Sequence, residues 1–280
     1  AAQKDRTDAV RLLLGKGADI NLQKNDGATA LIIASQAGNS EITRLLLEKG
    51  AETDLRKNDG STALMLASGK GFNDIITLLL DKGANPDLKN IRGETTLIIA
   101  TQNGQVETSR ILLERNANPD LQTNEGISAL IIATIKGDND IVRLLLENGA
   151  QPNLMSLNGF TALMHASING KTETANLLLE NGAKTDIKTP EGYTALMMAS
   201  LNGHADIVQL LTSYNANPNI QTPDGKTALM LASQNGHIDT VEVLLKNGAK
   251  PELKNNDGKT AFDLTESFVI KNLLTKYMKQ

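Results

Sequence analysis

Apolar and polar stretches alternate along the chain with a fixed spacing of 33 residues. In one period, Thr29 precedes the apolar run Ala30–Ala34, which ends before Gly38. An acidic residue then opens a second stretch, which carries Leu45–Leu47 and ends at Gly50. Thr is a favoured N-cap residue, and an acidic side chain stabilises the first turn of a helix. The pattern therefore predicts two short antiparallel helices per period, followed by an extended loop.

Three series of glycines mark this period. The first series is Gly27, Gly60, Gly93, Gly126, Gly159, Gly192, Gly225 and Gly258. The second is Gly38, Gly71, Gly104, Gly137, Gly170, Gly203 and Gly236. The third is Gly17, Gly50, Gly83, Gly149, Gly182 and Gly248, with Asn116 and Asn215 at its two other positions. Because Asn is the non-glycine residue that best tolerates a positive φ, the third series predicts left-handed residues that close helices.

One helix pair cannot bury its apolar face alone, so consecutive pairs must stack into an all-α solenoid. We expect one continuous domain with an N-terminal half-repeat at residues 1–25 and seven full repeats at 26–256. A capping repeat with a polar outer face fills residues 257–280. Ala1 and Ala2 align with Ala34 and Ser35, so the chain is expected to begin inside an inner helix.

The repeat resembles that of the ankyrin repeat family. The stretch Asp224–Asp239 reads DGKTALMLASQNGHID, and residues 244–249 read LLKNGA. The family usually has Thr-Pro-Leu-His where this chain has Thr-Ala-Leu-Met or Thr-Ala-Leu-Ile. The resemblance implies a solenoid of helix-turn-helix units with loop fingers. It also implies a non-catalytic scaffold that binds a partner protein or peptide on loop tips and the concave inner-helix face.

Composition excludes several kinds of chemistry. The chain has no cysteine and three histidines, so we expect no disulfide, no metal site and no cofactor. His204 and His237 share one register, which indicates a structural role, and His165 is expected to pack or to contact a partner. The net charge of −4 disfavours nucleic acid, and no apolar run is long enough for membrane insertion. No catalytic residue is predicted. We expect a cytoplasmic monomer.

Positions that vary between repeats predict the binding surface. The residue after each first-series glycine is apolar in three adjacent repeats, at Ile127, Phe160 and Tyr193. Two residues before the second-series glycine, the same repeats carry Ile135, Ile168 and Leu201. We call these six residues the apolar stripe, and Ile91, Met155 and Leu157 lie nearby on loop tips. Single apolar residues scattered over a surface are ordinary, but a contiguous apolar surface of this kind usually marks a binding site.

Cations gather on the early loop tips despite the acidic total. They are Lys24, Arg56, Lys57, Lys89 and Arg92. They either form an ordinary solvated surface or attract a partner with an apolar segment flanked by acidic residues.

Two other functions fit the same repeats. One is a targeting or regulatory module excised from a larger enzyme or channel, which the missing initiator Met and the mid-repeat start favour. The other is an engineered binding scaffold, which the absence of cysteine favours. The resemblance also implies that Asn21, Asn153 and Asn219 lie where such repeats resemble substrates of an asparaginyl hydroxylase.

Overall fold

A computed structural model describes residues 6–278, and over this range the chain forms helices with no strand. The inner helices are α2 (Ala30–Ala37), α4 (Ala63–Ser68), α6 (Thr96–Gln102), α8 (Ala129–Lys136), α10 (Ala162–Ile168), α12 (Ala195–Leu201), α14 (Ala228–Gln234) and α16 (Ala261–Leu264). The outer helices are α1 (Thr7–Gly15), α3 (Ser40–Glu48), α5 (Asn73–Asp81), α7 (Val106–Glu114), α9 (Asn139–Glu147), α11 (Thr172–Glu180), α13 (Ala205–Ser213), α15 (Ile238–Lys246) and α17 (Phe268–Met278). The predicted all-α architecture of paired helices is confirmed.

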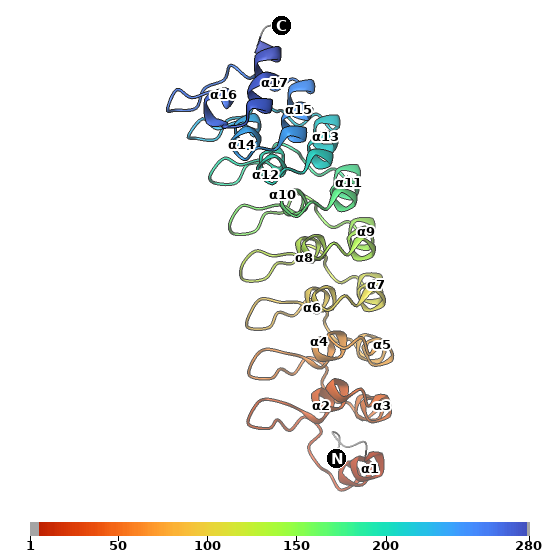
Figure 1. Ribbon diagram of the computed structural model, residues 1–280. Coiled ribbons are helices and arrows are strands. Elements are labelled where there is room, and N and C mark those ends of the chain that lie inside the picture. Colours follow the sequence, from red (N-terminus) through yellow and green to blue (C-terminus); the bar gives the residue numbers. More distant parts are fainter. Residues whose placement is uncertain (1–5, 279–280) are drawn as a thin grey trace. The chain divides into compact units, whose positions relative to one another are not determined.

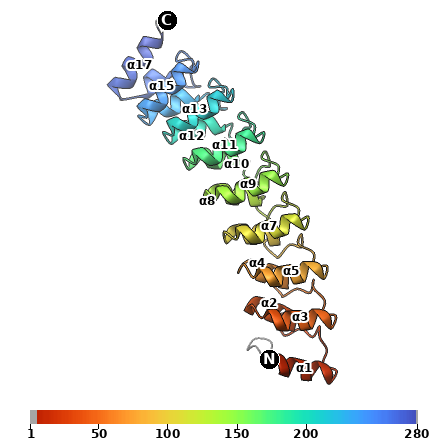
Figure 2. The same ribbon diagram turned by 90° about the vertical axis from the view of Figure 1, so that its right-hand side faces the viewer.

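The contacts divide the chain into two compact units. One comprises residues 1–133 and 143–151, and the other comprises residues 134–142 and 152–280. In the first unit α2 packs on α4 and α4 on α6, while in the second α10, α12, α14 and α16 follow one another in the same way. Extended loops, which we call fingers, project beside the inner helices (Figure 1), and Figure 2 shows α3, α5 and α7 side by side. The expectation of one continuous domain stays a prediction.

Each inner helix begins at the predicted N-cap. The Thr29 Oγ1 atom accepts a hydrogen bond of 3.2 Å from the backbone N–H of Ile32. Ser128, which replaces Thr in its repeat, accepts the equivalent bond from Ile131 at 3.3 Å. Such a cap contributes about 1 kcal/mol to helix stability. It fixes the start of each inner helix, and therefore the direction in which the preceding finger leaves it.

The outer helices end in left-handed residues, as the third glycine series predicts. Gly50 has a φ of 83°, and its two asparagine replacements have nearly the same conformation, with a φ of 60° at Asn116 and 62° at Asn215. Asn can adopt this conformation because its short polar side chain bonds locally. The break in the glycine series is thus a conservative replacement.

Neighbouring fingers are joined backbone to backbone. In the first unit, the Asn58 N–H donates to the Asp26 carbonyl at 2.9 Å, and the Asn58 amide donates to the Asn25 carbonyl at 3.0 Å. A Cβ placed on Gly27 would lie 2.8 Å from the Cα of Lys57, which is too close for any side chain. Glycine at this position is therefore required by the approach of the next finger as well as by its positive φ.

A second set of bonds links the loop after each outer helix to the next repeat. The Asp54 carboxylate accepts a bond of 3.0 Å from the Asn85 N–H. Asn153 acts likewise, since its Oδ1 accepts from Lys184 N–H at 2.8 Å and its Nδ2 donates to the Gly182 carbonyl at 3.0 Å. The shared oxygen acceptor explains why both Asn and Asp occur in this register. Hydroxylation at these asparagines stays a hypothesis.

The two ends lack the cover that interior repeats have. In α1, Leu13 is 54% exposed, whereas Leu46 at the equivalent position of the next repeat is 1% exposed. The expected inner-helix remnant at Ala1 and Ala2 lies outside the described residues. At the other end, Phe268 of α17 is 75% exposed, so the outer face of the cap is less polar than expected. Phe268 and its exposed neighbour Val269 show that α17 itself receives no covering repeat within the described chain.

Candidate interaction surface

The first register of the apolar stripe changes character along the chain. Ala28, Ser61 and Glu94 are buried, whereas Ile127, Phe160 and Tyr193 are half-buried. Ala28 and Ser61 are small and Glu94 is hydrogen-bonded, so these side chains are enclosed. The larger apolar side chains in the same register stay partly accessible to solvent. The three repeats that carry these larger residues therefore present partly exposed apolar surface beside their fingers.

Within the second unit, four predicted residues meet in one hollow. Leu157, Phe160, Tyr193 and Leu201 line a recess of about 610 Å³ together with Asn158, Pro190, Glu191 and Met198. We call it the aromatic recess. Ile168 is half-buried, Ile135 is 44% exposed and Met155 is exposed, and none of the three lines this recess. The recess has mainly apolar walls with an amide and a carboxylate among its lining groups.

The two aromatic residues are held by their own fingers. Ser156 N–H donates to the Phe160 carbonyl at 2.9 Å, and Phe160 N–H donates to Ser156 Oγ at 3.2 Å. Thr189 and Tyr193 repeat this pair of bonds at 2.9 and 3.3 Å. Each aromatic backbone is thus fixed before any partner binds, so little ordering is needed there.

His165 packs against Phe160, one of the residues that line the recess. Its ring centroid lies 5.5 Å from that of Phe160, and its Nε2 atom is buried without a described hydrogen-bond partner. Burial lowers the pKa of His165, because the charged imidazolium is poorly solvated there. A neutral ring of this kind packs against Phe160, which agrees with the packing role expected for His165.

His204 and His237 have the repeated structural role that their shared register predicts. The Nε2 atom of His204 lies 3.0 Å from the carbonyl oxygen of Ile168, and that of His237 lies 3.0 Å from the carbonyl oxygen of Leu201. Each ring therefore bonds the C-terminal end of the preceding inner helix.

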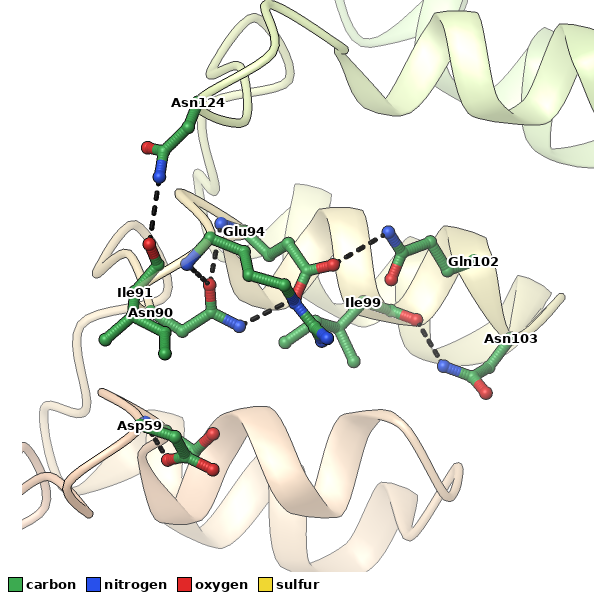
Figure 3. A network of polar contacts seen from close by, with 10 residues as sticks. Asp59, Asn90, Ile91, Glu94, Ile99, Gln102, Asn103 and Asn124 are labelled. Atoms are coloured by element: carbon green, nitrogen blue, oxygen red, sulfur yellow. Dashed lines mark hydrogen bonds and ion pairs between the residues drawn. The ribbon is translucent and has the colours of Figure 1, made fainter.

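Within the first unit, a charged recess of about 320 Å³ lies between two fingers. It is lined by Ile91, Arg92, Glu94, Gln102, Thr123, Asn124, Glu125, Ile127 and Ile132. Its two finger walls are tied together, since Asn124 donates from its N–H to the Arg92 carbonyl at 3.0 Å and from its amide to the Ile91 carbonyl at 2.9 Å (Figure 3). The walls are thus linked by direct hydrogen bonds.

Glu94 is a buried carboxylate with several donors (Figure 3). Its Oε2 accepts bonds from Asn90 Nδ2 at 2.7 Å and Arg92 Nε at 2.9 Å, and its Oε1 accepts from Gln102 Nε2 at 3.1 Å. Burial, the largest single influence, raises the pKa of this carboxyl. The hydrogen bonds of Asn90, Gln102 and Arg92, with the charge of Arg92, together outweigh burial and leave the pKa below its ordinary value. Glu94 is therefore ionised at neutral pH.

Several finger cations make bonds within the chain. Arg56 Nη1 donates to the Lys89 carbonyl at 3.3 Å, and Lys89 Nζ donates to the Gln122 carbonyl at 2.7 Å. Gln23 and Gln221, in the same register, donate to the next finger at 2.9 and 3.0 Å. The sequence already contains a signal for this bond between fingers. Gln, Arg and Lys differ in charge, and what they have in common is a long stem that ends in a hydrogen-bond donor. Sequence reasoning read the positions as charge and missed the shared hydrogen bond.

Comparison with known families decides the identity of the repeat. A family model described as "Ankyrin repeats (3 copies)" matches residues 1–90, 70–156, 97–189 and 149–222, and one described as "Ankyrin repeats (many copies)" matches residues 213–264. The chain belongs to the ankyrin repeat family. It is similar to the crystal structure of the human ASB11 ankyrin repeat domain, with a TM-score of 0.66 and 27% identity, covering 76% of this chain and 96% of that one. No curated protein matches the sequence.

Ankyrin repeats are typically protein-interaction modules and are usually non-catalytic, and the matched family models describe only such repeats. In the described part of the chain, no group of three or more His, Cys, Asp or Glu side chains is placed to hold a metal ion. Among the same residues, no helix has the length and apolar character needed to span a bilayer.

Proposed function

We propose that this ankyrin repeat chain is a non-catalytic scaffold that binds a partner polypeptide along its inner helices and fingers. The observation that carries the proposal is the aromatic recess, where Phe160 and Tyr193 are half-buried in a hollow of about 610 Å³. Aromatic side chains in such hollows dominate the binding energy of many interfaces.

The aromatic recess suits an apolar segment of the partner. Leu157, which is 75% exposed, lines the recess together with Met198 and Leu201 of α12. The backbone bonds of Ser156 and Thr189 hold both aromatic residues before binding, so less of the contact energy is lost to ordering. Ile135, Ile168 and Met155 lie in the same unit as the recess and belong to the proposed surface there, and Ile91 and Ile127 are proposed as partner contacts on the other unit.

The early fingers supply the proposed attraction for an acidic flank. Arg56 and Lys89 keep their positive charge while bonding the next finger, and Lys24 adds a third charge. Because these side chains are exposed, their effect on a partner is long-range and weakens with salt. Arg92 differs, since it pairs with Glu94 at 2.8 Å. Action as a cytoplasmic monomer without metal or cofactor belongs to the same proposal.

Affinity capture followed by mass spectrometry tests the proposal when the wild-type chain is run beside Phe160→Ala and Lys226→Ala. Lys226 occupies the same register as Phe160 outside the recess. A specific partner should be retained by wild type and Lys226→Ala and lost by Phe160→Ala. A partner captured equally by all three chains would show that the aromatic recess is not the binding surface.

A further inference from the structure

The charged recess carries a buried charge in a register where the following repeats carry apolar residues. Glu94 stands in the register of Ile127 and Phe160, and its side chain is 8% exposed. Burying a carboxylate is unfavourable unless charge and hydrogen bonds compensate it. Asn90 also accepts bonds from the N–H groups of Arg92 and Glu94, at 2.9 and 3.0 Å, so the finger turn itself holds the carboxylate in place.

We propose that the charged recess binds a basic side chain of the partner polypeptide, an ammonium or guanidinium group that pairs with Glu94 and Glu125. This inference rests on the proposed function, because the side chain belongs to the bound polypeptide. The proposal places a basic group of the partner in the recess itself. The cations on the early fingers had led us to expect an acidic segment of the partner over these repeats.

The hydrogen bonds of Glu94 are distributed unequally between its two carboxylate oxygens. Arg92 directs both its Nε and Nη2 atoms to Oε2, at 2.9 and 2.8 Å. Oε1 accepts one bond from the described residues, from Gln102 on α6, although a carboxylate oxygen can accept two. A cation bound in the recess would therefore find acceptor capacity at Oε1.

The walls of the recess fit the rest of a basic side chain. Ile127 and Ile132 line it together with Ile91, so they offer an apolar surface to a methylene stem. Lysine and arginine commonly pack their stems on apolar residues while their charged ends reach polar groups. The volume of about 320 Å³ lies at the lower end of the range for ligand sites, so it suits one side chain.

The charges of the lining residues favour a cation over an anion. Among the described residues, those that line the recess include one cation, Arg92, and two carboxylates, Glu94 and Glu125. The Arg92 side chain is 73% exposed, so its charge is screened by water, whereas that of Glu94 is enclosed. An incoming carboxylate would meet two like charges, but an incoming ammonium completes the balance.

An NMR titration tests the proposal with small probes. The full chain carries labelled isoleucine methyl groups, and the probes are n-butylammonium and n-butylguanidinium, with butanoate as the anionic control. We expect both cations to shift the methyl signals of Ile127 and Ile132 with saturating curves. Butanoate should leave them unshifted. Stronger binding by butanoate, or no shift with either cation, would overturn the proposal.

Matched variants assign the binding to the two carboxylates. Glu94→Gln should weaken cation binding about fivefold, and Glu125→Gln about twofold because that residue is exposed. Asp257→Asn removes one negative charge from the same register as Glu125 on a finger of the other unit, and it should leave the affinity unchanged. If Glu94→Gln disturbs folding, the Glu125→Gln variant still tests the assignment, and equal affinities of Glu125→Gln and Asp257→Asn would contradict it. Because no partner is used, failure here leaves the aromatic recess and its own test untouched.

Discussion

Replacing the finger cations separates their two roles, hydrogen bonding and charge. In the double variant Arg56→Ala/Lys89→Ala, both donors to the next finger disappear. In Arg56→Gln/Lys89→Gln, the charges disappear but a terminal donor remains. Gln23 and Gln221 already make this bond at 2.9 and 3.0 Å, so glutamine is known to reach the neighbouring carbonyl in this fold.

The expected magnitude follows from the two bonds and their exposure. Lys89 Nζ lies 2.7 Å from its acceptor and Arg56 Nη1 lies 3.3 Å from its own, and both residues are exposed. An exposed hydrogen bond of this kind contributes about 0.5–1 kcal/mol, so the alanine pair should lose about 1–2 kcal/mol of unfolding free energy. The glutamine pair should lose less than about 0.5 kcal/mol.

Urea unfolding measures the change in the unfolding free energy of the whole chain. Amide hydrogen exchange at Ile91 and Asn124 reports on the stability of the fingers themselves. Both amides donate to the preceding finger, at 3.1 and 3.0 Å. Exchange should accelerate in the alanine pair and stay near wild type in the glutamine pair. Equal loss of stability in the two pairs would refute the hydrogen-bond reasoning and assign the effect to charge or to the side-chain stems.

Three further outcomes are expected. Asn116→Ala should lower the unfolding free energy by about 1 kcal/mol in urea unfolding, whereas Asn116→Gly should not, because the residue has a φ of 60°; equal stability of the two variants would contradict this. Amide exchange should be fastest at residues 6–25, where Leu13 lacks cover, and protection matching that of α3 would count against a half-repeat. The pKa of Glu94 is lower in the folded chain than in the unfolded chain. Ionised Glu94 therefore stabilises the fold at pH values above the ordinary pKa of glutamate, and this contribution is lost as the pH falls through the lowered pKa. Acid titration of Glu94→Gln should accordingly show a smaller loss of stability below about pH 4.5 than wild type, and identical profiles would remove Glu94 from the explanation.

The sequence was sufficient to predict the backbone of the repeat. Thr29 and Gly50 occupy helix ends by local chemistry, and Asn116 has the conformation that its register required. Local signals of this kind depend on one or two turns of chain, so they can be read without knowing what packs nearby. The N-caps and closing residues were therefore predicted correctly.

What the side chains do between repeats was harder to predict. The bond of Lys89 to the next finger depends on the distance between two fingers, which no local pattern contains. Glu94 is one polar residue in a register that varies between repeats, and the sequence does not reveal that packing encloses it with Asn90 and Gln102 as donors. Phe160 was expected to be exposed, yet it is half-buried against His165. Each of these outcomes is set by neighbours one repeat away.

The half-burial of Phe160 changes what its removal should do to folding. Complete loss of a core phenylalanine costs 3–5 kcal/mol, so a half-buried ring should contribute about 2 kcal/mol to stability. Tyr193→Ala provides a second variant at the equivalent position of the next repeat, also half-buried. The two together allow binding to be judged even if one of them is too unstable for titration.

The measurement that tests the binding surface most directly is a calorimetric titration of the captured partner against wild type, Phe160→Ala, Tyr193→Ala and Lys226→Ala, each first shown to be folded. Phe160→Ala and Tyr193→Ala should each weaken binding by about 2 kcal/mol, roughly 30-fold in Kd. Lys226→Ala, in the same register but outside the aromatic recess, should change Kd by less than about threefold. Equal Kd values for all four chains would contradict the claim that Phe160 and Tyr193 anchor the partner.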